Sequence, residues 1–554
     1  MTEANTHTDQ DEKRMANDIP IAPEDETRPN TVAVTPTNSS SIDSDDQIQQ
    51  HTAPTYGDTE RGNGSKLEIQ RTKEGEEVIW VEFEKDDVEN PFNFSKHRKW
   101  LTTILSVIFT AEVAATAGAY VPGITSMERD LGESNHTVSL LGVSIYALGF
   151  GITPLILAPF SEVFGRNLIY LATHFFYTVL FVGTGLVNNM TGMLILRFLQ
   201  GGFGSTGSTM VGGTIADIWT TSERGLPMSL FSVGAIFGTG FGPFWAGFVA
   251  GNSKLEWRWI QYIQAIYTGA VFIVLLIFLK ETRGSVILTR RAVRLRNETG
   301  DNRYRAKAEE ERASIPILIK NSLTRPALML FSEPIVFVFS LWISFCWGMM
   351  YCLLESIGFI TELHNYSPGQ TGLVFLTICA GAIIGFFCNF YQDHLYTKNF
   401  MKRGPEARLY AACAAAILFP LGCFIYAWTS YPDVSIAGPI VGITALMTAV
   451  YTIYLAVFNY LADAYLVYAS SALAAQSFAR NMFGFAFPLF VTPMYHNLGY
   501  TWASTLVALI GAVLGVVPFI LFIYGHKIRA KSKLSLELQR LHEEQQKRLN
   551  QQQK

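Results

Sequence analysis

The sequence predicts an all-α membrane protein with twelve transmembrane helices in two six-helix halves. Three observations predict this fold. Of the 554 residues, 49% are hydrophobic and only 16% are charged, whereas a typical soluble domain has about 25% charged residues. From about residue 100 onward the chain holds about twelve apolar runs, each close to the ~20 residues that a helix needs to cross a bilayer. A long polar segment divides these runs into two groups of six.

Each apolar run is expected to be a helix, because lipid offers no hydrogen-bond partner to an unpaired backbone group. The expected spans of the first half are 101–120, 137–157, 167–187, 192–213, 229–250 and 259–279. Those of the second half are 334–360, 370–390, 408–428, 437–461, 475–497 and 501–524.

Five regions follow from these spans. The polar start is rich in Thr, Ser, Asp and Glu and cannot bury enough apolar surface to fold alone. We therefore expect a disordered cytoplasmic N-terminal tail, a basic cytoplasmic central loop and a cytoplasmic C-terminal tail around the two halves. The expected bounds, in chain order, are 1–95 (tail), 96–280 (first half), 281–330 (loop), 331–525 (second half) and 526–554 (tail).

Positive charge predicts the orientation. Lys and Arg are concentrated in the central loop, near residue 400 and after residue 524, and such segments stay on the cytoplasmic side. One short segment on the opposite side, 251–258, also carries positive charge. The start lacks the apolar core of a signal peptide, so the first apolar run serves as the targeting signal. Both termini are then cytoplasmic, and Asn135, in the sequon Asn135-His136-Thr137, is an external candidate for glycosylation.

The two halves are expected to be related repeats. The stretch after the fourth span begins Ala-Asp-x-aromatic at Asp217 and reaches Pro243, and the stretch after the tenth begins in the same way at Asp463 and reaches Pro488 at nearly the same distance. Matching positions in the two halves indicate a parallel repeat of the kind found in secondary transporters.

Three stretches carry residues with a specific spacing. LAPFSEVFGRN contains Glu162, Gly165 and Arg166, RFLQGGFGS contains Arg197, Gln200 and Gly201, and GTGFGPFWAG contains Gly238, Gly242, Pro243 and Gly247. Glycines four or five residues apart let a neighbouring membrane helix approach closely, and a proline frees a backbone carbonyl and permits a bend. Generic helix packing produces similar glycine spacings. The added Gly-Pro pair favours a specific functional motif over generic packing.

With these stretches the chain resembles the major facilitator superfamily, in the fungal drug:proton antiporter branch that includes polyamine and multidrug exporters. They are similar to its signatures G-x-x-x-D-R-x-G-R-R, R-x-x-Q-G and G-x-x-x-G-P-x-x-G-G. Five positions depart from the signatures: Ala158, Glu162, Val163, Asn167 and Ala246. The resemblance covers about residues 81–530.

The resemblance implies proton-coupled efflux of drugs, polyamines or a fungal secondary metabolite by alternating access. In the loop that contains Gly165 and Arg166, Glu162 is expected to cap a helix start or to pair across the two halves as an inward-side latch. The resemblance makes Arg197 part of proton coupling, in which it pairs with a carboxylate. We interpret Asp217, Arg224, Asp463 and Arg480 as cytoplasmic gate charges. The simpler alternatives are an ordinary charged loop, an Arg197 side chain that snorkels to the interface, and interfacial charges without a gating role.

Glu112 is the only charged residue in the first apolar run. A charge at this depth is expensive in lipid, so it faces a cavity or a partner, or it is protonated. The small residues around it, such as Ala111, Ala115 and Gly118, favour a helix that faces a cavity. Burial favours the neutral form of a carboxyl group, which suits a proton-coupled exporter. The alternative is a structural Glu bonded to a neighbouring helix.

Glu355 is the second acid, in the outer third of the seventh span. Trp347 and Tyr351 precede it by two turns and one turn, so they are expected on the same face, where their rings can bind a cation. We predict a substrate or gating role, against an outer interfacial charge. Two membrane acids favour amphipathic cations such as polyamines or drugs, with a fungal metabolite as the close alternative.

Several function classes are excluded or disfavoured. The sequence has no G-x-x-x-x-G-K-[ST] loop, no H-E-x-x-H and no nucleophile elbow, so we expect no enzyme activity, no cofactor and no metal. The expected partners are a small-molecule substrate, protons and the lipid bilayer, without nucleic acid, and the expected state is a monomer. The plasma membrane is the predicted location, with the vacuolar membrane as alternative. The alternative function is a proton-coupled nutrient or organic-acid transporter of the same fold.

Overall fold

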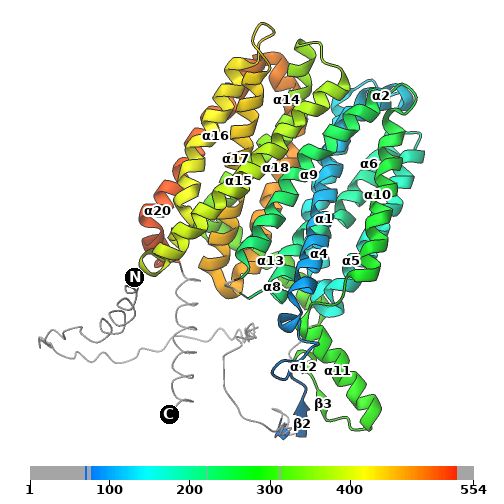
Figure 1. Cartoon of the computed structure of the whole chain (residues 1–554), viewed down its shortest axis with the longest axis vertical. Coiled ribbons are helices and arrows are strands. Elements are labelled where there is room, and N and C mark those ends of the chain that lie inside the picture. The colour runs from blue at the N-terminus through cyan, green and yellow to red at the C-terminus, as the bar shows by residue number, and fades with distance from the viewer. Residues whose placement is uncertain (1–68, 72–76, 221–222, 311–313, 533–554) are drawn as a thin grey trace, which may run out of the picture. The chain divides into compact units, whose positions relative to one another are not determined.

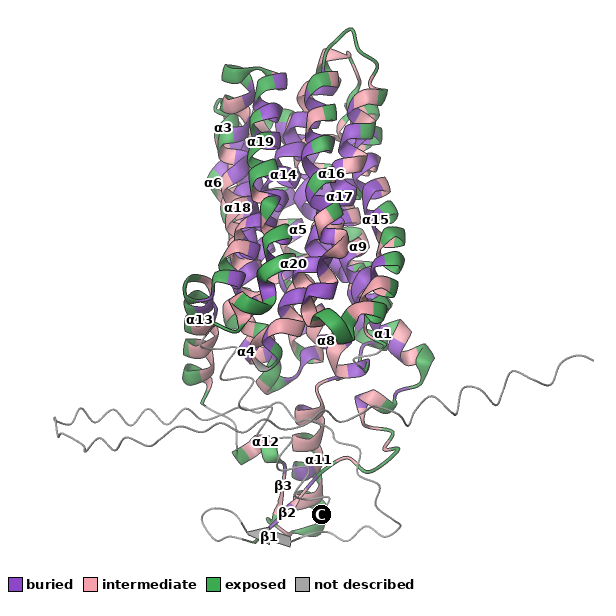
Figure 2. Cartoon of the chain, turned by 90° about the vertical axis from the view of Figure 1, so that its left-hand side faces the viewer, coloured by how far each residue is buried: buried purple, intermediate pink, exposed green. Residues whose placement is uncertain are grey.

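The computed structural model describes residues 69–71, 77–220, 223–310 and 314–532. Most of the predicted N-terminal tail (1–68 and 72–76) and the end of the C-terminal tail (533–554) lie outside the described residues. Long helices run side by side, with the first half in blue to green and the second half in yellow-green to red (Figure 1). Buried residues follow the inner faces of these helices, and exposed ones lie on the outside (Figure 2).

The helices of the first half match the expected spans to within a few residues. They are α1 (Lys96–Ala119), α3 (His136–Ile152) with α4 (Pro154–Phe164), α5 (Arg166–Leu186), α6 (Met190–Gly204) with α7 (Thr206–Thr209) and α8 (Val211–Ile218), α9 (Gly225–Ala250) and α10 (Glu256–Phe278). A short η2 (Val121–Gly123) and α2 (Ile124–Leu131) connect α1 to α3.

The second half follows the same pattern. Its helices are α14 (Pro334–Leu363), α15 (Pro368–Arg403), α16 (Tyr410–Thr429), α17 (Ala437–Tyr465), α18 (Ala469–Leu498) and α19 (Tyr500–Leu514) with α20 (Val516–Arg529). The turns η3 (Gly404–Leu409) and η4 (Leu466–Tyr468) lie between them. We call the end of the bundle where α1 begins and α20 ends the basic end, and the other the opposite end.

The described residues account for the twelve expected spans. Eight helical segments are long and apolar enough to cross a membrane, and one of them, Pro368–Thr429, holds both α15 and α16. The pair α3 and α4, bent by 42°, forms a further span. The remaining two are the broken series α6 to α8 and the more polar α18, which buries Gln476, Arg480 and Asn481.

Helix starts are set by side chains that accept hydrogen bonds from the free backbone N–H groups of the first turn. Ser95, Asn135 and Asn189 accept from Arg98, Thr137 and Gly192 at the starts of α1, α3 and α6. Ser367 and Gln370 form a reciprocal capping box at the start of α15. These caps explain why the helices begin a few residues outside the apolar runs.

The central loop folds into short elements at the basic end. It contains α11 (Gly284–Thr299), β3 (Tyr304–Arg305), α12 (Lys307–Glu310) and α13 (Ile315–Ser332). The parallel partner of β3 is β2 (Glu77–Trp80), which also pairs antiparallel with β1 (Ile69–Arg71), and η1 (Pro91–Asn93) precedes α1. The segment before α1 therefore forms backbone hydrogen bonds with the central loop.

An ion-pair cluster also joins this segment to α11. Arg291 contacts Asp87 at 2.6 Å and Glu89 at 2.7 Å. Hydrogen bonds from Arg291 are the main cause that lowers the pKa of both carboxyl groups below their ordinary values. Both acids therefore stay charged at neutral pH, and the cluster persists there.

Helix α9 lies between α1 and α15 and contacts both at backbone distance. A Cβ atom at Gly238 or Gly242 would overlap the backbone of Ala111 or Ala115 in α1. At Gly247 it would lie 2.5 Å from the carbonyl oxygen of Pro368 in α15. The glycines of the GTGFGPFWAG stretch thus bring one helix into contact with both halves of the molecule.

Gly242→Ala should therefore destabilise the protein. The added methyl group overlaps the α1 backbone, and overpacking of this kind costs about 1–3 kcal/mol. The measurement is the thermal unfolding midpoint of the purified protein in detergent. Gly358→Ala is the matched control, because a Cβ at Gly358 in α14 meets no atom within 4 Å. Equal midpoints for the two variants would contradict the close contact of α1 and α9.

Candidate functional site

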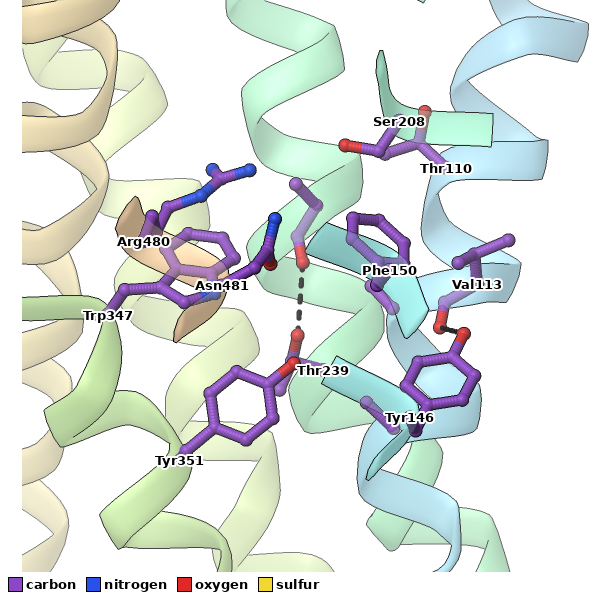
Figure 3. A pocket seen from close by; sticks show the side chains of 13 residues that line it. Thr110, Val113, Tyr146, Phe150, Ser208, Thr239, Trp347, Tyr351, Arg480 and Asn481 are labelled. Atoms are coloured by element: carbon purple, nitrogen blue, oxygen red, sulfur yellow. Dashed lines mark hydrogen bonds between the residues drawn. The ribbon is translucent and has the colours of Figure 1, made fainter. Parts of the chain in front are cut away.

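A small cavity lies between the two halves, near the middle of the long helices. Its volume is about 30 Å³, the space of roughly one water molecule. The first half contributes residues of α1, α3, α7 and α9, and the second half contributes residues of α14 and α18 (Figure 3). The lining residues are Thr110, Val113, Ala114, Ala117, Tyr146, Phe150, Ser208, Ala235, Thr239, Trp347, Tyr351, Arg480 and Asn481.

The second-half wall of the cavity is built on Arg480. The Arg480 side chain carries its guanidinium carbon 4.2 Å from the centre of the Trp347 ring and 4.9 Å from that of Tyr454. The Nε of Arg480 and the Nε1 of Trp347 are buried and have no hydrogen-bond partner. Trp347 and Tyr351 thus belong to one wall, whereas Glu355, which was expected on the same face, does not line the cavity.

Arg480 lies deeper than expected. We predicted a gate charge at the end of a helix starting near residue 475, but α18 begins at Ala469. At 1.5 Å per residue, the eleven residues from Ala469 place Arg480 about 16 Å along the helix. Arg480 therefore lines the central cavity instead of the basic end.

Glu112 faces away from this cavity, which corrects the expectation of a cavity-facing acid. Thr110, Val113, Ala114 and Ala117 line the cavity from α1, and at 100° per residue Glu112 lies on the opposite face of the helix. There its carboxylate is 3.5 Å from Nε2 of His174 in α5. The reason is that small residues near Glu112 form a close helix contact: Ala111 and Ala115 lie against glycines of α9. Their presence therefore does not identify a cavity face.

The Glu112 and His174 pair is buried and poorly satisfied. The two side chains are 2% and 0% exposed. Both carboxylate oxygens and the Nε2 atom lack a hydrogen bond of good geometry. Nδ1 of His174 lies 3.3 Å from the hydroxyl of Thr178, one turn further along α5.

Aromatic groups of four helices surround the pair. Phe109 of α1 and Phe272 of α10 contact the His174 ring, with centroids 4.5 and 5.9 Å away. The titratable groups that face Glu112 are the hydroxyls of Tyr146 in α3, Tyr177 in α5 and Tyr267 in α10. Among the described residues, no Lys or Arg forms an ion pair with Glu112.

His174 was missed by the motif reasoning, although a signal existed. It is the only charged or titratable residue other than tyrosine in the expected span 167–187. A histidine at this depth in the membrane is rare for the same reason as a glutamate, so His174 also marks a candidate functional site.

Arg197 is fully buried in α6 but has no carboxylate partner among the described residues. Its Nε donates to the Gly142 carbonyl at 3.1 Å, and its Nη1 donates to Gln200 at 3.3 Å. The rings of Tyr120 and Tyr146 lie 4.6 and 4.5 Å from its guanidinium carbon. The cation is thus held by dipoles and π faces, whereas a paired acid was expected.

The comparisons with known proteins address the fold and the family. Residues 104–488 match the family model described as Major Facilitator Superfamily. The chain belongs to the Major Facilitator Superfamily.

Two fungal relatives and one solved structure illustrate this membership. The chain is 37% identical to the MFS-type efflux pump MFS2 of Trichophyton rubrum, over 83% of this chain and 77% of that protein. It is 34% identical to the major facilitator superfamily multidrug transporter mdrA of Aspergillus fumigatus, over 82% and 75%. The xylose transporter XylE from E. coli, in a partially occluded inward open conformation, aligns with a TM-score of 0.53 at 13% identity, over 77% of this chain and 99% of XylE. That likeness concerns the fold alone.

At the basic end of this major facilitator superfamily protein, the two repeat acids each pair with an arginine. Asp217 at the end of α8 forms an ion pair with Arg166 at the start of α5. Asp463 at the end of α17 pairs with Arg408 of η3 at 2.9 Å. The predicted symmetry between Asp217 and Asp463 therefore extends to their partners.

The superfamily loop around Gly165 depends on a residue that the motif does not include. Gly165 has φ +101°, a conformation that favours glycine. A Cβ there would overlap the carboxylate of Glu281, which accepts hydrogen bonds from the backbone nitrogens of Arg166 at 3.0 Å and Asn167 at 3.3 Å. Glu162, by contrast, is exposed and forms no ion pair with the described residues.

The remaining predicted residues have structural contacts of their own. Gly201 approaches the Tyr146 backbone in α3 so closely that a Cβ would overlap it. Arg224, before α9, donates to the carbonyls of Ala216 and Trp219 at 3.4 Å.

Two further predicted residues lie away from the cavity. Glu355 accepts from the Thr492 hydroxyl at 2.9 Å, has one oxygen without a partner and does not line the cavity. Asn135 is exposed at the opposite end, where its side chain caps α3.

Proposed function

We propose that the protein is a proton-coupled efflux transporter, an antiporter that exports small molecules by alternating access. The observation that carries this proposal is the isolated pair of Glu112 and His174 on the back of the helix that lines the cavity. An ionisable pair inside a membrane bundle is expensive and is usually functional. Two fungal relatives, named as an efflux pump and a multidrug transporter, support the direction of transport.

The small volume of the cavity supports alternating access. Its volume of about 30 Å³ is far below the roughly 300–1,000 Å³ of a site for a drug-sized ligand. α9 contacts the second half towards both ends: Gly247 lies against Pro368 near the opposite end. Near the basic end, Ser229 accepts from Asn389 at 2.9 Å. Transport then requires that one of these contact sets opens while the other stays closed.

The pair of acid and imidazole can hold one proton without net charge. With one shared proton, either Glu112 is neutral beside neutral His174, or the two form an ion pair. Loss of that proton leaves a lone carboxylate in an apolar interior, which costs several kcal/mol unless water reaches it. Proton release is therefore tied to a conformation that hydrates the pair, and this supplies the coupling.

The other predicted roles complete the proposal. Arg197 contributes positive potential near α1, and the paired charges at the basic end stabilise one conformation. The basic end faces the cytoplasm, as the positive-inside rule requires, so both termini are cytoplasmic and Asn135 is external and open to glycosylation. We place the protein in the plasma membrane as a monomer, without enzyme activity.

Direction can be tested in sealed inside-out vesicles, in which the basic end faces the medium. A panel of fluorescent amphipathic compounds of positive, neutral and negative charge is supplied outside. An antiporter that exports should accumulate at least one of them when the lumen is acidic and none when the gradient is collapsed. Accumulation that requires an acidic medium instead would support the alternative, a proton-coupled nutrient or organic-acid importer.

Glu112→Gln should abolish accumulation driven by the proton gradient, by about tenfold or more, because the amide cannot bind and release a proton. Exchange of labelled for unlabelled compound without a gradient should persist, since the cavity is unchanged. Glu362→Gln is the matched control, an exposed glutamate at the end of α14. Vesicle content is compared by immunoblot, and normal driven accumulation by Glu112→Gln would contradict the proton role.

A further inference from the structure

Among the described residues that line the cavity between the halves, a single one is charged. That residue is Arg480, which is 4% exposed. The two acids that the sequence suggested for cation binding, Glu112 and Glu355, both lie outside the lining. The cavity wall therefore carries a positive charge, whereas two acids in the lining would make it negative.

Arg480 is a cation without a protein counter-charge. Among the described residues it has no ion pair and donates no hydrogen bond, and its Nε is buried without a partner. Its contacts are the rings of Trp347 and Tyr454. π faces stabilise a guanidinium only partly, and a buried cation is strongly stabilised by an anion that takes its fork of N–H groups.

The neighbouring groups add donors and flat apolar surface. The indole Nε1–H of Trp347, 7% exposed, also lacks a partner. Tyr146, Phe150 and Tyr351 supply aromatic surface around the same space (Figure 3). The cavity of about 30 Å³ is too small for such a ligand in this conformation. Once the two halves open and enlarge it, these groups match a ligand with an acidic group at one end and a flat apolar body at the other.

We infer that this cavity binds organic anions, aromatic carboxylates in particular, with Arg480 as the residue that holds the anionic group. The inference deepens the proposed efflux function by giving its substrate class, and it rests on that function only for the physiological role of binding. It replaces the expectation of amphipathic cations, which the charge of Arg480 disfavours.

The test is equilibrium binding to the purified full chain in nanodiscs, with three probes that share one ring system. They are 2-naphthoate (anion), 2-naphthamide (neutral) and 2-naphthylmethylammonium (cation). The wild-type protein should bind the carboxylate at least about tenfold more tightly than the other two, as expected for a charge-assisted hydrogen bond. Microscale thermophoresis on labelled protein gives the three dissociation constants.

Arg480→Gln should remove the preference for the carboxylate while changing the affinity for the neutral amide by less than about threefold. Retained amide binding also shows that the variant is folded. Arg480→Lys should keep part of the preference, because the charge remains but the fork is lost. Lys254→Gln, which removes one exposed charge at the opposite end, should behave like the wild type.

Three results would overturn the inference: no binding of 2-naphthoate to the wild type, equal or tighter binding of the ammonium probe, or an unchanged carboxylate preference in Arg480→Gln. No gradient is applied in this experiment, so its outcome is independent of the vesicle assays. Carboxylate binding without driven export would contradict the proposed function alone, and driven export of cations without carboxylate binding would contradict this inference alone.

Discussion

The contact of α9 with α1 and α15 is the constraint on which the rest of the structure depends. Gly238 and Gly242 bring α9 onto the backbone of α1, and Gly247 brings the same helix onto α15 of the second half. At these three glycines no side chain of α9 separates the backbones, so α1 cannot shift without moving α9 or losing contact with it. Close-packed interfaces of this kind have discrete arrangements and deform little between them.

This constraint connects two sites that do not touch. One face of α1 lines the cavity, and the other carries Glu112 beside His174. A change in the charge of the pair alters where α1 is most stable, and a ligand in the cavity does the same from the other side. Both sites therefore change the preferred position of α1 and α9, and this shared position couples proton binding to substrate binding. The proton and the substrate do not need to compete directly for one site.

A proton site and an anion site together also allow the membrane potential to drive export. If one proton enters for each monovalent anion that leaves, two positive charge equivalents move inward per cycle. Each is worth about 2.3 kcal/mol per 100 mV of membrane potential. Export of an anion by a proton antiporter therefore draws on the electrical gradient twice, whereas exchange of one proton for a monovalent cation moves no net charge.

Sequence patterns predicted the parts that depend on local spacing. Apolar run length identified the spans, the repeat identified Asp217 and Asp463 as equivalent positions, and the glycines near Pro243 identified a close helix contact. The direction in which a side chain points from its helix, and its depth along the helix, were harder to predict from the sequence. The small residues near Glu112 pack against α9 and gave no sign of which way Glu112 points, and the polar start of α18 concealed how deep Arg480 lies. Both are set by tertiary packing.

The central claim is that substrate binding and proton release are linked through Glu112. The most direct measurement is the number of protons that the purified protein releases into weakly buffered solution when it is saturated with a compound that the vesicles accumulate. The account predicts about one proton per bound substrate for the wild type and none for Glu112→Gln, because linkage acts only through a group that titrates. Equal release by both proteins would contradict the account.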